Sequence, residues 1–138
     1  MSKVTASATR SVSAPAERVL AILRDYHLRA QILPDSYSRV EVAQDGSRLS
    51  YRFSSPGRER DFRLRAQPSE AGLTERDELS SYVQTWTVTE TATGSTVTVQ
   101  AAWDGSGGVG GLFERLFAPL GLRRVFTEML ELLAASAE

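Results

Sequence analysis

The sequence predicts an α+β domain in which a curved antiparallel β-sheet wraps around a long C-terminal helix. From residue 37 to residue 104, segments with apolar residues at alternate positions are separated by glycine-containing turns, a pattern typical of an antiparallel meander. From residue 112 to residue 135, apolar residues recur at roughly helical spacing. Before the meander we expect one strand followed by two short helices.

Length and composition predict a single domain spanning residues 1–138, because 138 residues suffice for one core but not for two ordinary domains. The chain has 16 Lys and Arg against 17 Asp and Glu, so no strong positive field favours nucleic acid. The absence of cysteine excludes disulfides and thiolate metal sites. Neither a signal peptide nor a membrane-spanning segment is recognised, so we expect a cytoplasmic protein that is a monomer or a weak homodimer.

The first strand is predicted at residues 3 to 12, where apolar and polar residues alternate. A helix is expected after Ser13-Ala14, because Pro15 suits the first helical turn and Glu17 suits the positive end of the helix dipole. The segment from Asp25 to Pro34 predicts a second short helix or turn that ends before the proline.

The meander is divided by turns at five pairs of residues: Asp45-Gly46, Pro56-Gly57, Ala71-Gly72, Thr93-Gly94 and Asp104-Gly105. A further break is expected near Ser80-Ser81, although no glycine or proline marks it. Residues that share one parity within each segment predict the inward face of the sheet. They are Val40 and Val42; Leu49, Tyr51 and Phe53; Phe62 and Leu64; Trp86 and Val88; and Val97, Val99, Ala101 and Trp103.

The C-terminal region is expected to be a glycine-rich loop over residues 105–111 and then a helix. Its apolar stripe contains Leu116, Leu120, Phe126, Met129, Leu130 and Leu133. Pro119 predicts a kink or break near Ala118, and residues 105–118 are expected to move as a gate. The loop contains the glycine spacing of a dinucleotide-binding fingerprint. That interpretation is disfavoured, because a parallel βαβ unit is required and the chain ends in the helix.

Four segments give the chain its resemblance to a known family: Val12-Ser13-Ala14-Pro15-Ala16-Glu17-Arg18-Val19, Asp25-Tyr26, the strand with Trp86, and Gly94-Ser95-Thr96-Val97. In this order and spacing, the chain resembles the START-like helix-grip superfamily (SRPBCC), in particular its bacterial polyketide cyclase/dehydrase and lipid-transport branch. The resemblance covers nearly the whole chain. It implies binding of a small apolar ligand between sheet and C-terminal helix. Some members are enzymes and many are not, so the fold does not settle the function.

The candidate ligand-binding residues are mostly large side chains on the expected inner faces, because rings on a curved sheet cannot all reach the helix and leave room for a ligand. Tyr26 is included because of the family resemblance. The candidates are Tyr26, Tyr51, Phe53, Phe62, Leu64, Gln84, Trp86, Val99, Trp103, Phe117, Phe126 and Met129.

An unusual feature is a strand in which Leu73, Glu75, Asp77 and Leu79 share one parity, so that inward leucines would bring two carboxylates with them. Buried carboxylates need partners: Arg10 has the inward parity of the first strand, and Gln84 shares the parity of Trp86. Two alternatives remain: a twist that turns Thr74, Arg76 and Glu78 inward, or an edge with both faces in water. The candidate catalytic residues are Glu75, Asp77, Tyr51 and Arg10.

The predicted function is binding of a lipid, isoprenoid, quinone or polyketide, and the alternative is a cyclase or dehydrase that uses acid-base residues of the cavity. An interaction module that uses the outer face of the sheet is a third class. His27 is the only histidine, so neither a metal site nor a cofactor is expected. Several arginines alternate with acidic residues, which favours a solvated outer face over nucleic-acid binding. They are Arg58, Arg60, Arg63, Arg65 and Arg76.

Overall fold

The computed structural model describes residues 3–55, 58–104 and 108–138, and it describes only the backbone of residues 55, 58 and 108–118. Strand β1 (Lys3–Val12) leads into helix α1 (Ala16–Arg24), helix α2 (Tyr26–Arg29) and the 3-10 turn η1 (Ala30–Ile32). Six strands and a long helix follow: β2 (Tyr37–Val42), β3 (Arg48–Ser55), β4 (Arg58–Ser69), β5 (Gly72–Asp77), β6 (Val83–Thr91), β7 (Gly94–Asp104) and α3 (Gly108–Ala137).

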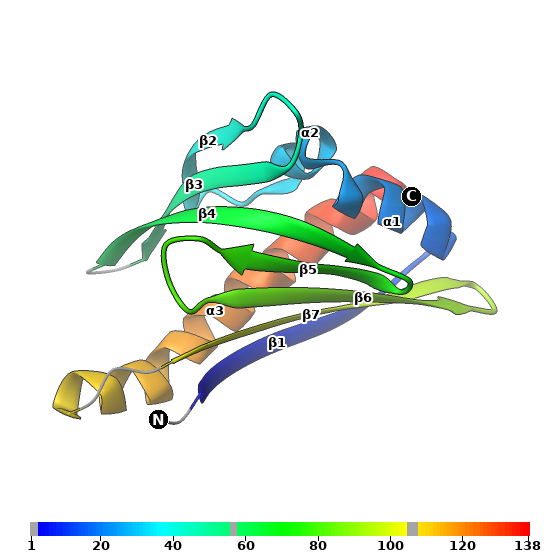
Figure 1. The fold of residues 1–138 in the computed structure, drawn as a ribbon. Helices are drawn as coiled ribbons and strands as arrows, with labels where there is room; N and C mark the ends of the chain where they lie inside the picture. The colour runs from blue at the N-terminus through cyan, green and yellow to red at the C-terminus, as the bar shows by residue number, and fades with distance from the viewer. Residues whose placement is uncertain (1–2, 56–57, 105–107) are drawn as a thin grey trace.

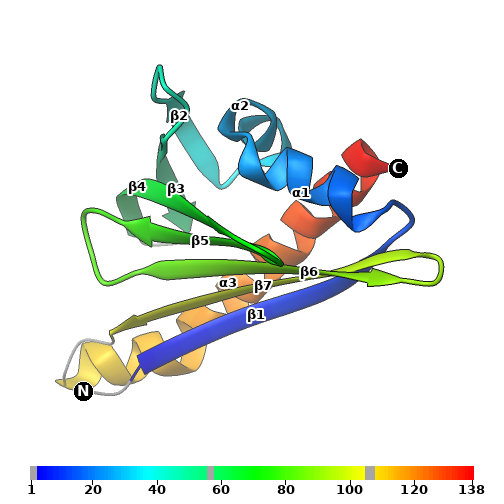
Figure 2. The same ribbon diagram turned by 45° about the vertical axis from the view of Figure 1, so that its right-hand side comes forward.

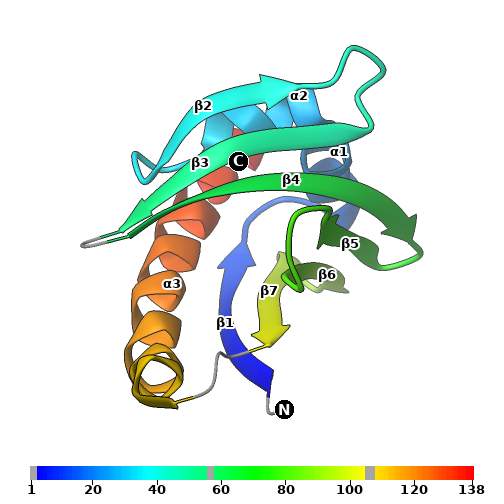
Figure 3. The ribbon, with the colours of Figure 1, turned by 60° about the vertical axis from the view of Figure 1, so that its left-hand side comes forward.

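The seven strands form one antiparallel sheet in the order β1-β7-β6-β5-β4-β3-β2. The sheet is strongly curved, and α3 runs along its concave side (Figures 1 and 3). Helices α1 and α2 lie beside the C-terminal part of α3 (Figure 2). The predicted α+β architecture, with a curved sheet around a C-terminal helix and two short helices after the first strand, is confirmed.

The core lies between the concave face of the sheet and one face of α3. Alternate residues of β7 are buried, as the sequence predicts, and so is the α3 face that carries Phe126, Met129, Leu130 and Leu133. Apolar burial at period 2 in the sheet and at helical period in α3 is therefore what holds the two layers together.

The start of α3 differs from the prediction. The helix begins at Gly108 and continues through Pro119 to Ala137, so the expected loop is shorter and the expected break near Ala118 is absent. A proline inside a helix removes one backbone hydrogen bond, and the packed face from Val125 onward compensates for that loss. Leu120 is exposed and does not belong to the apolar stripe. The gate predicted at residues 105–118 stays untested, because residues 105–107 and the side chains of residues 108–118 lie outside the described part of the chain.

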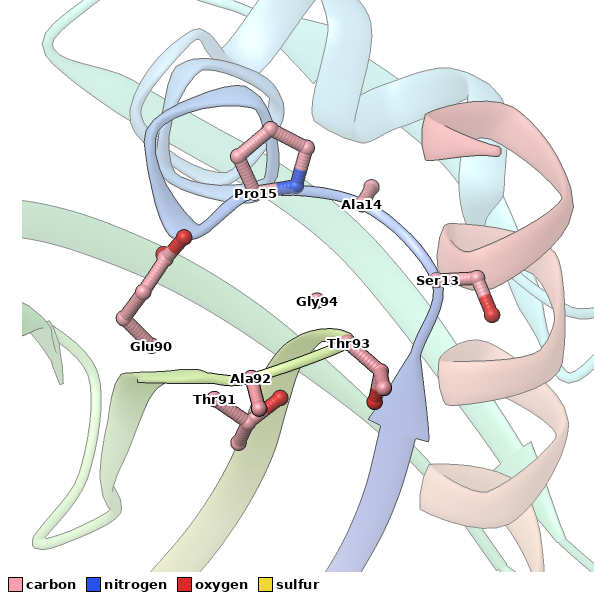
Figure 4. A pocket seen from close by; sticks show the side chains of 8 residues that line it. All are labelled: Ser13, Ala14, Pro15, Glu90, Thr91, Ala92, Thr93 and Gly94. Carbon is pink, nitrogen blue, oxygen red and sulfur yellow. The ribbon is translucent and has the colours of Figure 1, made fainter.

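The junction between β1 and α1 is held by acidic side chains from distant segments. A carboxylate oxygen of Glu90 accepts a hydrogen bond from the backbone N–H of Ala16 at 2.7 Å, at the start of α1. Glu138 likewise accepts from the N–H of Ser13 at 2.9 Å, and Arg18 donates to the carbonyl oxygen of Ala137 at 3.1 Å. A surface pocket of about 240 Å³ lies here, lined by residues 13–15 and 90–94 (Figure 4).

We predict that Gly72→Ala lowers the free energy of unfolding by about 1–3 kcal/mol, the usual cost of overpacking. A Cβ atom at Gly72 would overlap the backbone carbonyl of Trp86 on the neighbouring strand. Gly121→Ala is the matched control, because a Cβ there meets nothing within 4 Å and alanine raises helix stability by about 1 kcal/mol. Urea denaturation measures both variants, and equal midpoints would contradict the close approach at Gly72.

Candidate functional site

A buried carboxylate, that of Glu75 on β5, is the centre of a polar cluster between the sheet and the helices. Its Oε1 accepts hydrogen bonds from Trp86 Nε1 at 2.6 Å and from Gln84 Nε2 at 3.0 Å. Its Oε2 accepts from Arg29 Nη1 at 2.7 Å and from the Tyr26 hydroxyl at 2.8 Å. A carboxylate has about four acceptor sites, so this cluster leaves Glu75 no free lone pair for a ligand.

The local structure explains why these donors meet. On β6, Gln84 pairs directly with Glu75, and Trp86 lies two residues further along, so both side chains share the inward face with Glu75. Tyr26 and Arg29 are three residues apart on α2 and therefore project from the same side of that helix. Because α2 and the sheet supply two donors each, the carboxylate joins the two layers.

Arg29 is almost completely buried, with 1% of its surface exposed. Its Nη2 lies 3.8 Å from the sulfur of Met129, and its guanidinium carbon lies 4.5 Å from the centroid of the Trp86 ring, a cation–π contact. Burial lowers the pKa of Arg29, but the charge of Glu75 and the hydrogen bond to it raise that pKa above its usual value, so Arg29 stays charged. Its Nε has no hydrogen-bond partner in the described part of the chain.

Beside this cluster, six aromatic side chains form a continuous aromatic band across the inner face of the sheet. Successive ring centroids lie 4.7 Å apart between Tyr37 and Tyr51, 5.3 Å between Tyr51 and Phe62, and 4.9 Å between Phe62 and Tyr82. These distances fit favourable stacked and edge-to-face contacts. The band consists of Tyr37, Tyr51, Phe53, Phe62, Tyr82 and Trp103.

The hydroxyl groups of the band differ in their hydrogen bonding. The Tyr82 hydroxyl donates to Gln84 Oε1 at 2.6 Å and so connects the band to the Glu75 cluster. The Tyr37 and Tyr51 hydroxyls make no hydrogen bond among the described residues, but neither oxygen is fully shielded from solvent, since Arg29 Nε is the fully buried side-chain atom there without a partner. Burial is the main cause that raises the pKa of Tyr37, Tyr51 and Tyr82. These phenols therefore remain protonated at neutral pH and can donate a hydrogen bond to a ligand oxygen.

Most of the predicted ligand-binding residues lie in this interior. Phe53 is half-buried, and the side chain of Phe117 lies outside the described residues. The others are buried: Tyr26, Tyr51, Phe62, Leu64, Gln84, Trp86, Val99, Trp103, Phe126 and Met129. Their contact with a ligand stays a prediction.

The four candidate catalytic residues have different surroundings. Glu75 and Asp77 are both buried, which confirms the predicted orientation of this strand, although Leu79 beyond its end is exposed. Tyr51 belongs to the aromatic band. The prediction that Arg10 faces the interior is wrong, because its side chain is exposed. Arg10 has the inward parity of β1, but a long side chain on an edge strand can reach solvent.

Asp77 is hydrogen-bonded to β4 and to the loop between β5 and β6. Its Oδ1 accepts from the backbone N–H of Arg63 at 2.8 Å, and its Oδ2 accepts from the Ser80 hydroxyl. The two inward carboxylates thus have separate sets of partners. The predicted break near Ser80-Ser81 falls in this loop.

Sequence reasoning missed Arg29, Tyr37 and Tyr82. The three-residue spacing between Tyr26 and Arg29 is the signal that indicates a shared helix face. Tyr82 shares its parity with Gln84 and Trp86, which were recognised. No local pattern indicates that Arg29 is buried, because arginine is mostly an exposed residue.

The remaining observations concern metal ligands, membrane-spanning helices and the surface of the described part of the chain. The described residues contain no group of three or more His, Asp or Glu side chains that could hold a metal ion. None of the helices in the described part is long and apolar enough to span a membrane. His27 is exposed, and so are Arg60, Arg63, Arg65 and Arg76. A surface pocket of about 340 Å³ lies at the β4–β5 hairpin, lined by residues 65–68 and Arg76.

The comparisons with known proteins agree with this architecture. A profile of the family described as "Polyketide cyclase / dehydrase and lipid transport" matches residues 3–138. The NMR solution structure of KanY protein is 36% identical, with a TM-score of 0.89 and 99% of each chain covered. A search of the curated proteins gave no match.

Two more distant solved structures share the fold. The Zhui aromatase/cyclase from Streptomyces sp. R1128 is 15% identical, with a TM-score of 0.76. The match covers 99% of this chain and 94% of Zhui. Norcoclaurine synthase from Thalictrum flavum, in complex with dopamine and hydroxybenzaldehyde, is 16% identical, with a TM-score of 0.69. The match covers 97% of this chain and 86% of the synthase. At such identities the likeness shows the fold alone.

We predict that Arg29→Met and Glu75→Gln each lower the free energy of unfolding by about 3–5 kcal/mol, because each leaves a buried charge without its partner. The double variant should cost about 1–3 kcal/mol less than the sum of the two single variants. Urea denaturation of the four proteins measures this coupling. Strictly additive costs would mean that the ion pair contributes nothing to stability.

The chain has four tyrosines, and burial is the leading cause that raises the pKa of every one of them. A raised folded-state pKa stabilises the fold below the unfolded pKa, about 10 for tyrosine, and that stability is lost as the pH rises further. We therefore expect almost no tyrosinate absorbance until the protein unfolds in alkali, and then all four to ionise together. Gradual ionisation in the folded protein near pH 10 would contradict their burial.

Proposed function

Because the chain belongs to the polyketide cyclase / dehydrase and lipid transport family, we propose that it binds a small, largely apolar molecule between the sheet and α3. One observation carries this proposal. An aromatic band lies beside Arg29 Nε, a buried donor that has no hydrogen-bond partner among the described residues, and the hydroxyls of Tyr37 and Tyr51 in the band make no hydrogen bond there either. A filled, purely structural core normally satisfies a buried donor such as Arg29 Nε.

The chemistry of the band and its donors supports a particular kind of ligand. Aromatic side chains offer large flat surfaces, which favour a ligand with rings or conjugated bonds. A buried donor without a partner costs about 1–3 kcal/mol, and a ligand oxygen that accepts a hydrogen bond recovers this energy. Quinones and polyketides carry both rings and carbonyl oxygens, so they fit this interior better than saturated isoprenoids or plain lipid chains.

The solved structures provide support of the same kind. The complex of norcoclaurine synthase contains dopamine and hydroxybenzaldehyde, two small aromatic molecules, within the same fold. Zhui is an aromatase/cyclase. Both proteins support a small ring-containing ligand for this chain.

A cyclase or dehydrase activity is the second candidate function. It is favoured by Arg29 Nε and the hydroxyls of Tyr37 and Tyr51, because donors that bind a carbonyl oxygen also stabilise the negative charge that develops there during enolisation. The buried carboxylates of Glu75 and Asp77 already accept hydrogen bonds, so among the described residues neither is a free base. Loss of water from a bound substrate, seen by mass spectrometry of the incubated mixture, would reveal this activity.

Ligand binding is tested by titrating the protein with flavonoids, quinones and fatty acids while tryptophan fluorescence is recorded. Trp86 and Trp103 lie in the proposed site, so a ring-containing ligand should quench their emission. Native mass spectrometry of freshly purified protein would show any ligand already bound. If no compound binds at any soluble concentration and the purified protein carries none, the proposal is wrong.

We predict that Tyr37→Phe and Tyr51→Phe each weaken binding of a carbonyl-containing ligand about fivefold to tenfold, the equivalent of about one hydrogen bond. Tyr82→Phe is the matched control, because its hydroxyl is already engaged with Gln84. That variant should lose stability while its ligand affinity changes little. Equal losses of affinity in all three variants would argue against a direct role for the two free hydroxyls.

A further inference from the structure

We infer that the interior selects neutral ligands over anionic ones, and that Glu75 sets this selectivity by neutralising Arg29. This inference rests on the proposed ligand-binding function and specifies the charge of the ligand. The observation behind it is that the buried cation of this interior already has a buried anion within hydrogen-bond distance, at 2.7 Å.

Among the described residues, the buried charged side chains carry no excess of positive charge. The charged residues that are buried there are Arg29, Glu75 and Asp77. Arg29 and Glu75 cancel each other, and Asp77 is engaged in the β5–β6 loop. A ligand carboxylate would therefore enter the interior without a cation left to compensate it, which is costly in a medium of low dielectric constant.

The geometry around Arg29 points in the same direction. Its Nη1 donates to Glu75 and its Nη2 contacts Met129, whereas Nε is the buried nitrogen of the guanidinium that has no hydrogen-bond partner among the described residues. An anion bound to Nε would share one guanidinium with the Glu75 carboxylate. The two negative charges would then lie close together and repel each other. A carbonyl oxygen can accept from the same N–H without this repulsion.

The remaining titratable groups near the pair do not alter the balance. They are the phenols of Tyr26 on α2, Tyr37 on β2, Tyr51 on β3 and Tyr82 before β6, whose electrostatic interactions with Arg29 or Glu75 accompany their raised pKa values. All four are neutral at physiological pH. They offer hydrogen bonds but no charge.

The test compares two probes of matched shape, 2-acetylnaphthalene and 2-naphthoate, by calorimetric titration of the wild-type protein. At neutral pH the ketone should bind at least tenfold more tightly. As the pH falls toward the pKa of naphthoic acid, the affinity for the acid should rise toward that of the ketone, whose own affinity stays constant over the range in which the protein is folded.

The outcomes separate this inference from the proposed function. Equal affinities for ketone and carboxylate at neutral pH would overturn the charge selectivity while ligand binding stands. A preference for the carboxylate would do the same. Binding of neither probe, nor of any other compound tested, would overturn both.

Glu75→Gln tests the residue itself, because it removes the negative charge and keeps the size of the side chain. Arg29 then has no anionic partner, so the ratio of naphthoate to ketone affinity should rise at least tenfold over wild type. Asp77→Asn is the matched control: it removes a buried carboxylate that does not contact Arg29, and the ratio should stay unchanged.

An unchanged ratio in a folded Glu75→Gln protein would refute the role of Glu75, and so would an equal rise in both variants. Circular dichroism establishes whether each variant is folded. If Glu75→Gln does not fold, the wild-type comparison at two pH values decides the inference alone.

Discussion

The hydrogen bonds to the carboxylate of Glu75 are the interaction on which the arrangement of this molecule depends. Two donors come from β6 and two from α2, so the short helix is fixed against the sheet by a charge that cannot stay buried without them. Arg29 extends the connection to α3 through its contact with Met129 and to the sheet through the Trp86 ring. The cluster therefore works as a unit, in which the loss of any member leaves a buried polar group without its partner.

The interior combines this cluster with the aromatic band, in which the hydroxyls of Tyr37 and Tyr51 make no hydrogen bond among the described residues. Tyr82 joins the two parts, since its ring packs in the band and its hydroxyl reaches Gln84. A core that served stability alone would be expected to use apolar side chains at positions such as Tyr37 and Tyr51, because their hydroxyls make no hydrogen bond among the described residues. Arg29 Nε, which is buried without a hydrogen-bond partner among the described residues, is therefore the atom that most favours the proposed ligand binding.

The order of elements and the inward faces of the strands could be predicted from the sequence, because burial repeats at period 2 in a strand and apolar residues mark it directly. Glu75 was found by the same parity rule. Its partners on β6, Gln84 and Trp86, were recognised as inward-facing, but its partnership with α2 was not, because Tyr26 and Arg29 lie 49 and 46 residues away along the chain and only the packing of α2 brings them there. Parity also failed for Arg10, where the edge of the sheet decides exposure, and Pro119 did not end its helix because tertiary packing outweighs local propensity.

Strand β1 lies at one edge of the sheet and pairs with β7. In the chain these two strands are the first and the last of the sheet. On the ribosome, β1 is made first but cannot be hydrogen-bonded into the sheet until some ninety further residues have been added, about the separation of the partners Thr9 and Thr98. The contacts of Ser13 with Glu138 and of Arg18 with Ala137 form later still. Closure of the sheet is therefore a late event in the maturation of this chain, and the high sequence separation of its closing contacts favours slow folding.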